Sequence, residues 1–219
     1  MIHGVDVVID VQGVAVKSAT PLATASSAIV GGGVAVVDAI LNVHVPKGFA
    51  CADATAAITA FARAHAITGP YVGMLTAAWT EKAETATARR GALTALAIAT
   101  VGLSNAITAG VSPPAAAMSA STINTIVVVD GGGDPAALVN ACMTVTEVKT
   151  LALIEAGVKG ADGHPATGTS TDAVVVAATL RGAAQRFGGP ISDLGWVVGQ
   201  AAGAALRRGI ARWLAERSA

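Results

Sequence analysis

The chain has 219 residues, of which 53% are apolar, 13% are charged and 3% are aromatic. Fourteen basic and fourteen acidic residues cancel, so no basic excess is present to hold a phosphate backbone, and we expect no nucleic-acid partner. The length fits one compact domain with a sizeable core, and we predict a single domain over residues 1–219.

The two most apolar stretches, residues 91–111 and 196–214, are both interrupted by polar or charged side chains. Neither contains the roughly 20 apolar residues that span a bilayer, and the N-terminus lacks the pattern of a signal peptide. The two cysteines, Cys51 and Cys142, lack metal-type spacing and are expected to be free, partly buried thiols in a reducing cytosol. We therefore expect no membrane span and a cytoplasmic location.

The predicted elements begin with a β-hairpin over residues 5–18, because two short apolar strands flank a Gln-Gly pair. The three glycines at residues 31–33 mark a turn between two apolar segments. Asp53 is placed to cap a helix that runs to about Arg63. Residues 71–78 then have the composition of a strand.

The second half of the chain continues this mixture of strands and helices. A glycine turn precedes a strand that ends at Gly102, and a further strand over residues 122–130 leads into a glycine loop. Asp134 caps a helix that begins with proline and ends at Gly157. One more strand and a helix that starts near Ser192 complete the chain. The irregular order predicts an α+β fold, with helices packed on a mixed or mostly antiparallel sheet.

Four predicted strands end in small polar clusters. Hydroxyl, amide and glycine residues at strand ends suit a cleft where the backbone approaches a ligand closely. The same residue types also fill ordinary turns, and both interpretations stay open for each cluster. The clusters occupy residues 75–80, 100–106, 121–126 and 166–173.

The last of these clusters places several hydroxyl groups, including those of Thr167, Thr169 and Thr171, beside the carboxylate of Asp172. It lacks the Gly-x-Ser-x-Gly elbow of serine hydrolases and a nearby histidine base. It also lacks the Gly-Lys-Ser/Thr ending of a phosphate-binding loop. The pattern therefore supports a polar pocket more than a hydroxyl nucleophile.

Two further groups are candidates for proton transfer. Glu147 is expected at the edge of the apolar face of its helix, where loss of solvent would suit an acid or base, although an ordinary solvated glutamate fits equally well. His44 follows Asn42 at strand spacing, so both side chains point the same way. His44 is a possible base or a structural residue. No pair of histidines has metal-ligand spacing, and we expect no protein-bound metal.

Several blocks of the sequence together resemble one known family. The segments TINTIVVVDGGGDPAALVNACMTVTEVKTLAL and ATGTSTDAVVVA are similar to adenosylcobinamide amidohydrolases of the CbiZ type. The blocks SSAIVGGG, ILNVHVP, GMLTAAWT and TVGLSNA match the same family in the same order. The resemblance covers roughly residues 18–205. Val148 and Ser170 stand where the family usually has smaller residues, which affects the expected shape of the pocket mouth.

The resemblance implies hydrolysis of the amide that joins the aminopropanol side chain to the corrin ring of adenosylcobinamide. The product is adenosylcobyric acid, which a cell reuses when it salvages corrinoids. The corrinoid is then a substrate that carries its own cobalt, and no cofactor is expected. The alternatives are a non-catalytic corrinoid-binding protein, or an amidohydrolase of the same scaffold that acts on another small amide.

Combining the residues with this resemblance, we expect Glu147, Asp172 and His44 to handle protons, with Lys149 as a charge partner. The attacking nucleophile stays open between water and a Thr or Ser hydroxyl. The alanine- and glycine-rich last helix allows close packing inside the fold or between subunits, and we expect a homo-oligomer. The residues expected to contact the substrate are Asn42, Thr76, Asn105, Asn124, Lys149, Thr167, Gly168, Thr169 and Thr171.

Overall fold

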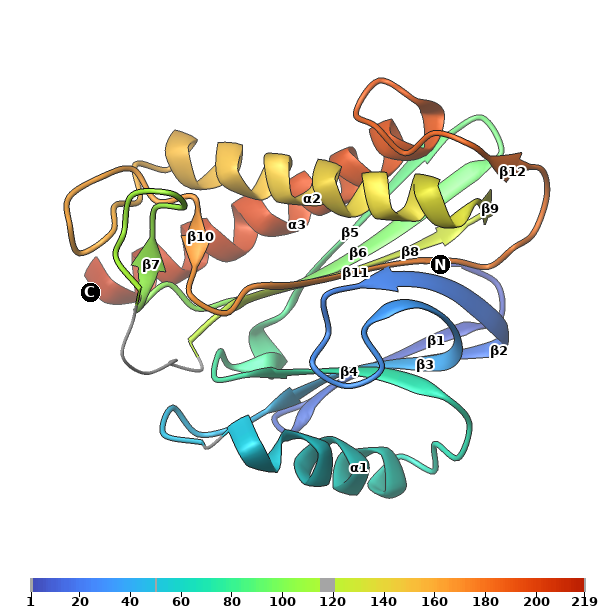
Figure 1. Cartoon of the computed structure of the whole chain (residues 1–219), viewed down its shortest axis with the longest axis horizontal. Coiled ribbons are helices and arrows are strands. Elements are labelled where there is room, and N and C mark those ends of the chain that lie inside the picture. The colour runs from blue at the N-terminus through green and yellow to red at the C-terminus, as the bar shows by residue number, and fades with distance from the viewer. Residues whose placement is uncertain (1, 50, 115–120, 219) are drawn as a thin grey trace.

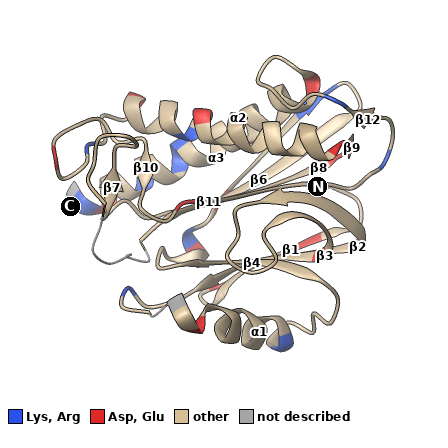
Figure 2. Cartoon of the chain, viewed as in Figure 1, with Lys and Arg blue, Asp and Glu red and all other residues tan. Residues whose placement is uncertain are grey.

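The computed structural model describes residues 2–49, 51–114 and 121–218. Within these ranges the chain forms three α-helices and a mixed eight-stranded sheet (Figure 1). The α+β class expected from the sequence is confirmed. Charged side chains are sparse on the strands and lie mainly on helices and loops (Figure 2).

The sheet has the strand order β4-β3-β2-β11-β8-β6-β5, and β1 pairs with the N-terminal part of β2. All neighbouring pairs are antiparallel except β3–β4 and β8–β11, which are parallel. The eight strands are β1 (Val5–Ile9), β2 (Gly13–Ser26), β3 (Gly33–His44), β4 (Tyr71–Thr76), β5 (Glu84–Arg90), β6 (Leu93–Val101), β8 (Ile123–Asp130) and β11 (Ala173–Ala178).

The long strands β2 and β3 fold this sheet into two layers. Their register shifts between Lys17 and Leu22, at an irregularity where the pair bends. Beyond the shift, β2 pairs with β11, whereas before it β2 pairs with β1. Figure 1 shows the layer of β1, β3 and β4 beneath the layer of β5, β6, β8 and β11. The predicted hairpin is confirmed, although its second strand continues eight residues further than expected.

The helices cover the two outer faces of these layers (Figure 1). Helix α1 (Ala54–Ala64) buries Ile58, Phe61 and Ala62 against the lower layer, as its apolar spacing predicts. Helices α2 (Pro135–Glu155) and α3 (Asp193–Ser218) lie on the upper layer. The predicted ends of α2 are confirmed, since the glycine after it adopts a positive φ of 68°.

The predicted caps need a correction. Asp53 and Asp134 stand at the N-cap positions, but neither side chain makes a capping hydrogen bond. At the start of α3, the Ser192 hydroxyl oxygen accepts a hydrogen bond from the Gly195 amide at 3.0 Å. This serine therefore supplies the side-chain cap that the two aspartates lack.

Helix α3 packs its small residues inside the fold. Ala201, Ala202 and Ala205 are fully buried, and a Cβ at Gly199 would lie 3.5 Å from the Thr144 methyl group on α2. The close packing expected of this helix is thus used within one chain. The homo-oligomer stays a prediction that these residues do not support.

Helix α2 is, within the described ranges, the one helix that is long and apolar enough to cross a membrane by length and composition. Its apolar residues include Leu138, Val145 and Leu153, which are buried between the sheet and α3. Core packing accounts for these residues, whereas 44% of the apolar window is buried in all and Val139, Met143, Leu151 and Ile154 are exposed.

Four short strands pair outside the main sheet. β7 (Ala106–Ile107) pairs with β10 (Gly168–Thr169), and β9 (Gly132–Gly133) pairs with β12 (Ala184–Gln185). They were not predicted from the sequence, because a strand of two residues has no periodicity. The β7–β10 pair brings two of the predicted polar clusters together beside the C-terminal half of α2 (Figure 1).

Candidate active site

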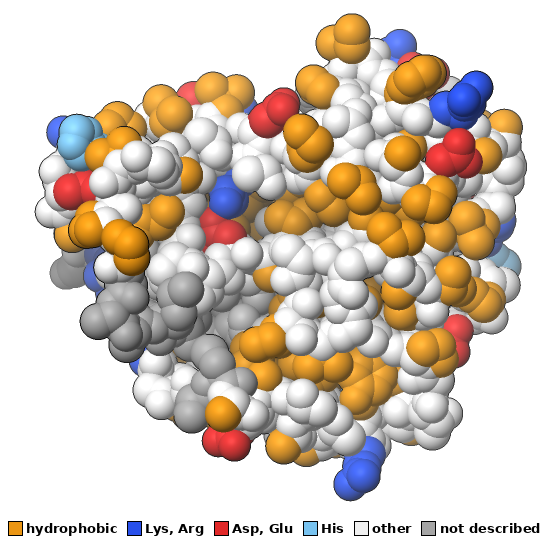
Figure 3. Space-filling view, viewed as in Figure 1, with side chains coloured by type: hydrophobic (Ala, Val, Ile, Leu, Met, Phe, Trp, Pro, Cys, Tyr) orange, Lys and Arg blue, Asp and Glu red, His pale blue; other side chains and the backbone are white. Residues whose placement is uncertain are grey.

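A pocket of about 660 Å³ lies between α2 and the upper layer. Its wall is formed by the end of β2, the start of β3, the start of β11 and the middle of α2. Figure 3 shows this face, with hydrophobic side chains gathered around a hollow that holds a basic and an acidic side chain. The apolar lining includes Val34, Val139, Met143 and Val174, and the charged lining consists of Glu147, Lys149 and Asp172.

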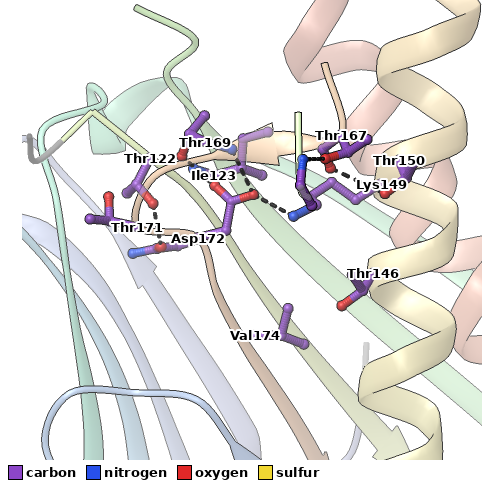
Figure 4. A network of polar contacts seen from close by, with 12 residues as sticks. Thr122, Ile123, Thr146, Lys149, Thr150, Thr167, Thr169, Thr171, Asp172 and Val174 are labelled. Carbon is purple, nitrogen blue, oxygen red and sulfur yellow. Dashed lines mark hydrogen bonds and ion pairs between the residues drawn. The ribbon is translucent and has the colours of Figure 1, made fainter. Parts of the chain in front are cut away.

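The Asp172 carboxylate lies where β11 begins and accepts four hydrogen bonds (Figure 4). One oxygen accepts the Ile123 amide at 3.0 Å and the Thr169 hydroxyl. The other accepts the Thr169 amide at 3.1 Å and the Lys149 ammonium. The Lys149 and Asp172 side chains are only 8% and 11% exposed. Four donors satisfy this carboxylate, so it fixes Lys149 in place at the deep end of the pocket.

The local backbone leaves room for this ion pair only because residue 168 is glycine. A Cβ at Gly168 would lie 2.5 Å from an Asp172 carboxylate oxygen and 2.7 Å from Lys149 Nζ. Neither distance is possible without moving the pair. The expected role of Gly168 in the site is therefore geometric: it lets the loop approach the two charged groups closely.

The neighbouring threonines hold the loop in place. The Thr150 hydroxyl donates to the Thr167 carbonyl at 3.1 Å, and the Thr167 hydroxyl accepts the Ala109 amide at 2.9 Å. Figure 4 shows Thr150 and Thr167 next to Lys149, on the side away from Asp172. Thr167 thus ties the loop to both α2 and the segment after β7.

Three other predicted residues belong to the loop that carries Asp172 or contact it. Thr169 is buried and donates its hydroxyl to Asp172. The Thr171 hydroxyl donates to the Ser121 carbonyl at 3.4 Å. The Asn105 amide nitrogen donates to the Ser170 hydroxyl at 2.7 Å. Their polar groups support the loop around Asp172, and none of the three side chains is part of the pocket wall.

Asn42, Thr76 and Asn124 do not line this pocket, and their expected contact with the substrate stays a prediction. Asn124 Nδ2 donates to the Asn42 side-chain oxygen at 2.7 Å and to the Leu75 carbonyl at 2.8 Å. Asn42 Nδ2 donates to the Thr100 hydroxyl at 3.0 Å, and Thr76 accepts the amide of Ala78. All are buried between the two layers. Strand alternation turns these side chains inward, where they join the layers.

His44 does not meet Asp172 either. Its Nδ1 atom lies 3.0 Å from the Ala78 carbonyl oxygen, and its ring stacks on Trp79 with centroids 5.2 Å apart. It is not among the residues that line the pocket with Lys149. His44 is half-buried beside Trp79, away from Lys149 and Asp172, and its expected role as a base stays a prediction.

Glu147 is exposed at the pocket wall, which agrees with the solvated glutamate that the sequence left open beside a desolvated acid or base. Lys149, two residues further along the helix, is buried. The reason is that α2 packs against both the sheet and α3, which widens its buried arc beyond a single apolar stripe. The two side chains nevertheless line one pocket, with Lys149 paired to Asp172 as expected of a charge partner.

Some of the residues that line the pocket were not predicted from the sequence. Ser26 and Ser27 belong to the matching block SSAIVGGG but were given no role. Cys142 also lines the pocket, and burial raises the pKa of its thiol from 9.0 to about 11, against a smaller lowering by a backbone hydrogen bond. The thiol is thus protonated at neutral pH and is a poor nucleophile. The side chain of Cys51 lies outside the described part of the chain.

A model of one protein family, described as adenosylcobinamide amidohydrolase, matches residues 2–218. The chain belongs to the adenosylcobinamide amidohydrolase family. The resemblance noted in the sequence is thereby confirmed over nearly the whole chain. Family membership implies an amide hydrolase that acts on adenosylcobinamide in corrinoid remodelling. No curated protein sequence matches the chain.

Solved structures resemble the family fold seen here at low sequence identity. A β-aminopeptidase from Burkholderia sp. has a TM-score of 0.54 and 13% identity, covering 97% of this chain and 84% of its own. An L-aminopeptidase D-Ala-esterase/amidase from Ochrobactrum anthropi is described as a variant of the Ntn hydrolase fold. It has a TM-score of 0.45 and 12% identity, and the match covers 94% of this chain and 82% of that one. A Pyrococcus horikoshii protein has a TM-score of 0.49 and 12% identity, and the match covers 97% of this chain and 83% of that one. The first of these likenesses supports a shared fold.

Proposed function

We propose that this amidohydrolase binds adenosylcobinamide in the pocket between α2 and β11, with the aminopropanol amide beside Lys149. The observation that carries the proposal is the buried Lys149–Asp172 pair at the deep end of an apolar pocket. Among the described residues that line this pocket, Lys149 is the only cation. A fixed cation beside the scissile amide stabilises the oxyanion that develops during hydrolysis.

The charge and polarity of the pocket suit this substrate. Glu147 and Asp172 outnumber Lys149, so the lining carries a net negative charge. Adenosylcobinamide is a cation whose ring edge carries both methyl groups and amide side chains. Val34, Val139 and Met143 offer apolar contacts along the pocket, whose volume of about 660 Å³ lies in the usual range of ligand sites. The side chain and one edge of the ring would enter, leaving the rest of the corrinoid outside.

In the proposed reaction, Lys149 donates a hydrogen bond to the amide carbonyl oxygen. Water adds to the carbonyl carbon, and the negative charge that develops on oxygen is stabilised by the ammonium group. Asp172 is a positioning residue, because its other three donors hold it still while it orients Lys149. No reorganisation of the cation is then needed during the reaction.

Glu147 is the proposed general base and acid. Its exposed carboxylate lines the pocket, unlike the fully hydrogen-bonded Asp172. It would take a proton from the attacking water and return it to the amide nitrogen as the carbon–nitrogen bond breaks. The products are a corrinoid carboxylate and protonated aminopropanol, so atoms and charge balance. The protonated Cys142 thiol takes no part.

Mass spectrometry of the products tests this assignment. The purified protein should convert adenosylcobinamide to adenosylcobyric acid and release aminopropanol. Glu147→Gln should lower kcat by at least about a hundredfold, the size expected for loss of a general base. Glu155→Gln removes an exposed carboxylate on the same helix, where it pairs with Arg207 outside the pocket, and should keep full activity. Full activity in Glu147→Gln would refute its role.

Lys149→Met tests the oxyanion role, and it carries a risk of misfolding because Asp172 would remain buried without its cation. The double variant Lys149→Met/Asp172→Asn removes both charges and serves as the folded alternative. Both should lose at least about a hundredfold in kcat. If the double variant folds and its kcat is unchanged, the ion pair takes no part in the reaction. The cytoplasmic location and the homo-oligomer stay proposals, and size-exclusion chromatography tests the second.

A further inference from the structure

A second pocket, of about 330 Å³, lies beside the C-terminal part of α3. It is built from the segments that follow β3 and β4, the end of β6 and the last turns of α3. It holds two of the chain's three tryptophans, Trp79 and Trp213. Its charged lining consists of Lys47, Lys82, Arg212, Arg217 and Glu216. None of these residues belongs to the pocket of Lys149.

Trp79 has the geometry of a stacking platform. Its side chain is 59% exposed, which is unusual for so large an apolar ring. The His44 ring stacks on it with an interplanar angle of 16° and fixes its orientation. Since one face of the indole is covered by His44 and the residue lines the pocket, the remaining face is available to a planar ring. Trp213 has one face covered by Arg217, 4.3 Å from the ring centroid.

The cations around these rings exceed the carboxylates. Glu216 pairs with Lys82 at 2.8 Å and with Arg212 at 3.9 Å, and Arg212 also reaches Glu84. Within the described residues, neither Lys47 nor Arg217 has a carboxylate partner. Both therefore keep their charge uncompensated at the pocket, which favours an anionic ligand.

The floor of the pocket adds a buried hydroxyl group. Ser121 is 4% exposed, and its oxygen accepts the Ser104 amide at 3.3 Å. Its hydroxyl group is thus held at the pocket wall, where it can also donate to a ligand oxygen.

We propose that this second pocket binds a nucleoside monophosphate, with the base on Trp79 and the phosphate between Lys47 and Arg217. Tryptophan stacks any nucleobase, and the two uncompensated cations match a phosphate group. The pocket repels a cationic corrinoid, so its ligand differs from the substrate of the first pocket. The inference does not depend on the roles assigned to Glu147, Lys149 and Asp172.

Isothermal titration calorimetry with three probes tests the proposal. Adenosine monophosphate should bind at least about tenfold more tightly than adenosine, which lacks the phosphate, or inorganic phosphate, which lacks the ring. Trp79→Ala should weaken the nucleotide about tenfold and leave phosphate binding unchanged. Lys47→Met should weaken both the nucleotide and phosphate. The two variants alter exposed side chains on separate segments, so misfolding of one variant would leave the other as a valid test.

Matched controls separate specific binding from general charge and aromatic effects. Phe187→Ala removes an exposed aromatic ring outside the pocket, and Lys159→Met removes an exposed cation outside it. Both should bind the nucleotide like the parent protein. Equal affinity for the nucleotide and for phosphate, absence of saturable binding, or equal losses in the control variants would each overturn the proposal.

Discussion

The Lys149 ammonium on α2 and the Asp172 carboxylate at the start of β11 form a buried ion pair, although 23 residues separate them in sequence. The pair lies where the helix layer meets the sheet, at the deep end of the larger pocket. It joins two elements whose other contacts lie mainly in the apolar core. In the proposed mechanism the reaction depends on this pair as well as the stability of the fold, and the two contributions can be measured separately.

Removing one partner of this pair should destabilise the protein more than removing both. Lys149→Met leaves a buried carboxylate without its cation and should lower the free energy of unfolding by about 3–5 kcal/mol. Lys149→Met/Asp172→Asn should recover much of that loss, because no uncompensated charge remains. Urea denaturation of the single and double variants measures the coupling. Additive losses would show that the pair is not coupled.

Substitution of Gly168 should affect activity through the same pair. In Gly168→Ala the new methyl group meets both charged side chains, so Lys149 must shift and kcat should fall at least about tenfold. Gly199→Ala is the matched control, since its methyl group finds ordinary contact distances of 3.5 Å and 3.6 Å inside a helix. It should keep activity and gain up to about 1 kcal/mol of stability. Steady-state kinetics and thermal melts of both variants provide the comparison.

The Cys142 thiol should make the stability of the protein depend on pH in the alkaline range. Its pKa is raised by burial from 9.0 to about 11. The folded state therefore holds a proton that the unfolded state releases, and this stability is fully present below about pH 9. It should be lost as the pH rises toward 11, by about 2–3 kcal/mol.

Urea denaturation between pH 8 and pH 11 measures this loss, with Cys142→Ala as the comparison. The variant lacks the titrating thiol and should show a flatter decline over the same range. Parallel curves for the two proteins would mean that the thiol ionises equally in both states.

The buried amide groups between the layers should contribute stability and not substrate affinity. Asn42→Ala leaves Asn124 and Thr100 without one hydrogen-bond partner each and should cost about 1–3 kcal/mol. The KM for adenosylcobinamide should stay within about twofold, because the site lies in the interior and not at the pocket. Denaturation curves and kinetics on one preparation check both statements. A large rise in KM in a stable variant would restore Asn42 to the binding site.

Thr125 offers a stabilising substitution. Its hydroxyl is buried and has no partner within the described residues, so Thr125→Val, which keeps the shape, should stabilise the protein by about 1 kcal/mol. Thr144→Val is the contrasting variant, because the Thr144 hydroxyl donates to the Gly188 carbonyl at 3.0 Å. Thr144→Val should therefore lower the stability of the protein. Chemical denaturation ranks the two against the parent, and an order opposite to this one would point to a hidden partner of Thr125.

Much of the secondary structure was predictable because its signals are local. The apolar spacing in α1, the proline and glycine at the two ends of α2, and the turn before β6 each depend on neighbouring residues. The folding of the sheet into two layers was not predictable. It depends on a register irregularity in β2 and on pairing between strands that are distant in sequence. Neither feature produces a periodic pattern along the chain from which it could be predicted.

The site divides in the same way. The sequence by itself determined the family, the polar cluster around Asp172 and the charged residues of α2, because the order of motifs and the residue types can be read directly from the sequence. The tertiary structure alone decided which of them meet. It brought Lys149 to Asp172 and Glu147 to the same pocket, and it turned Asn42 and Asn124 into the interior. The physical reason is that burial and pairing depend on how helices and strand faces pack, and spacing along one element cannot reveal what lies opposite it.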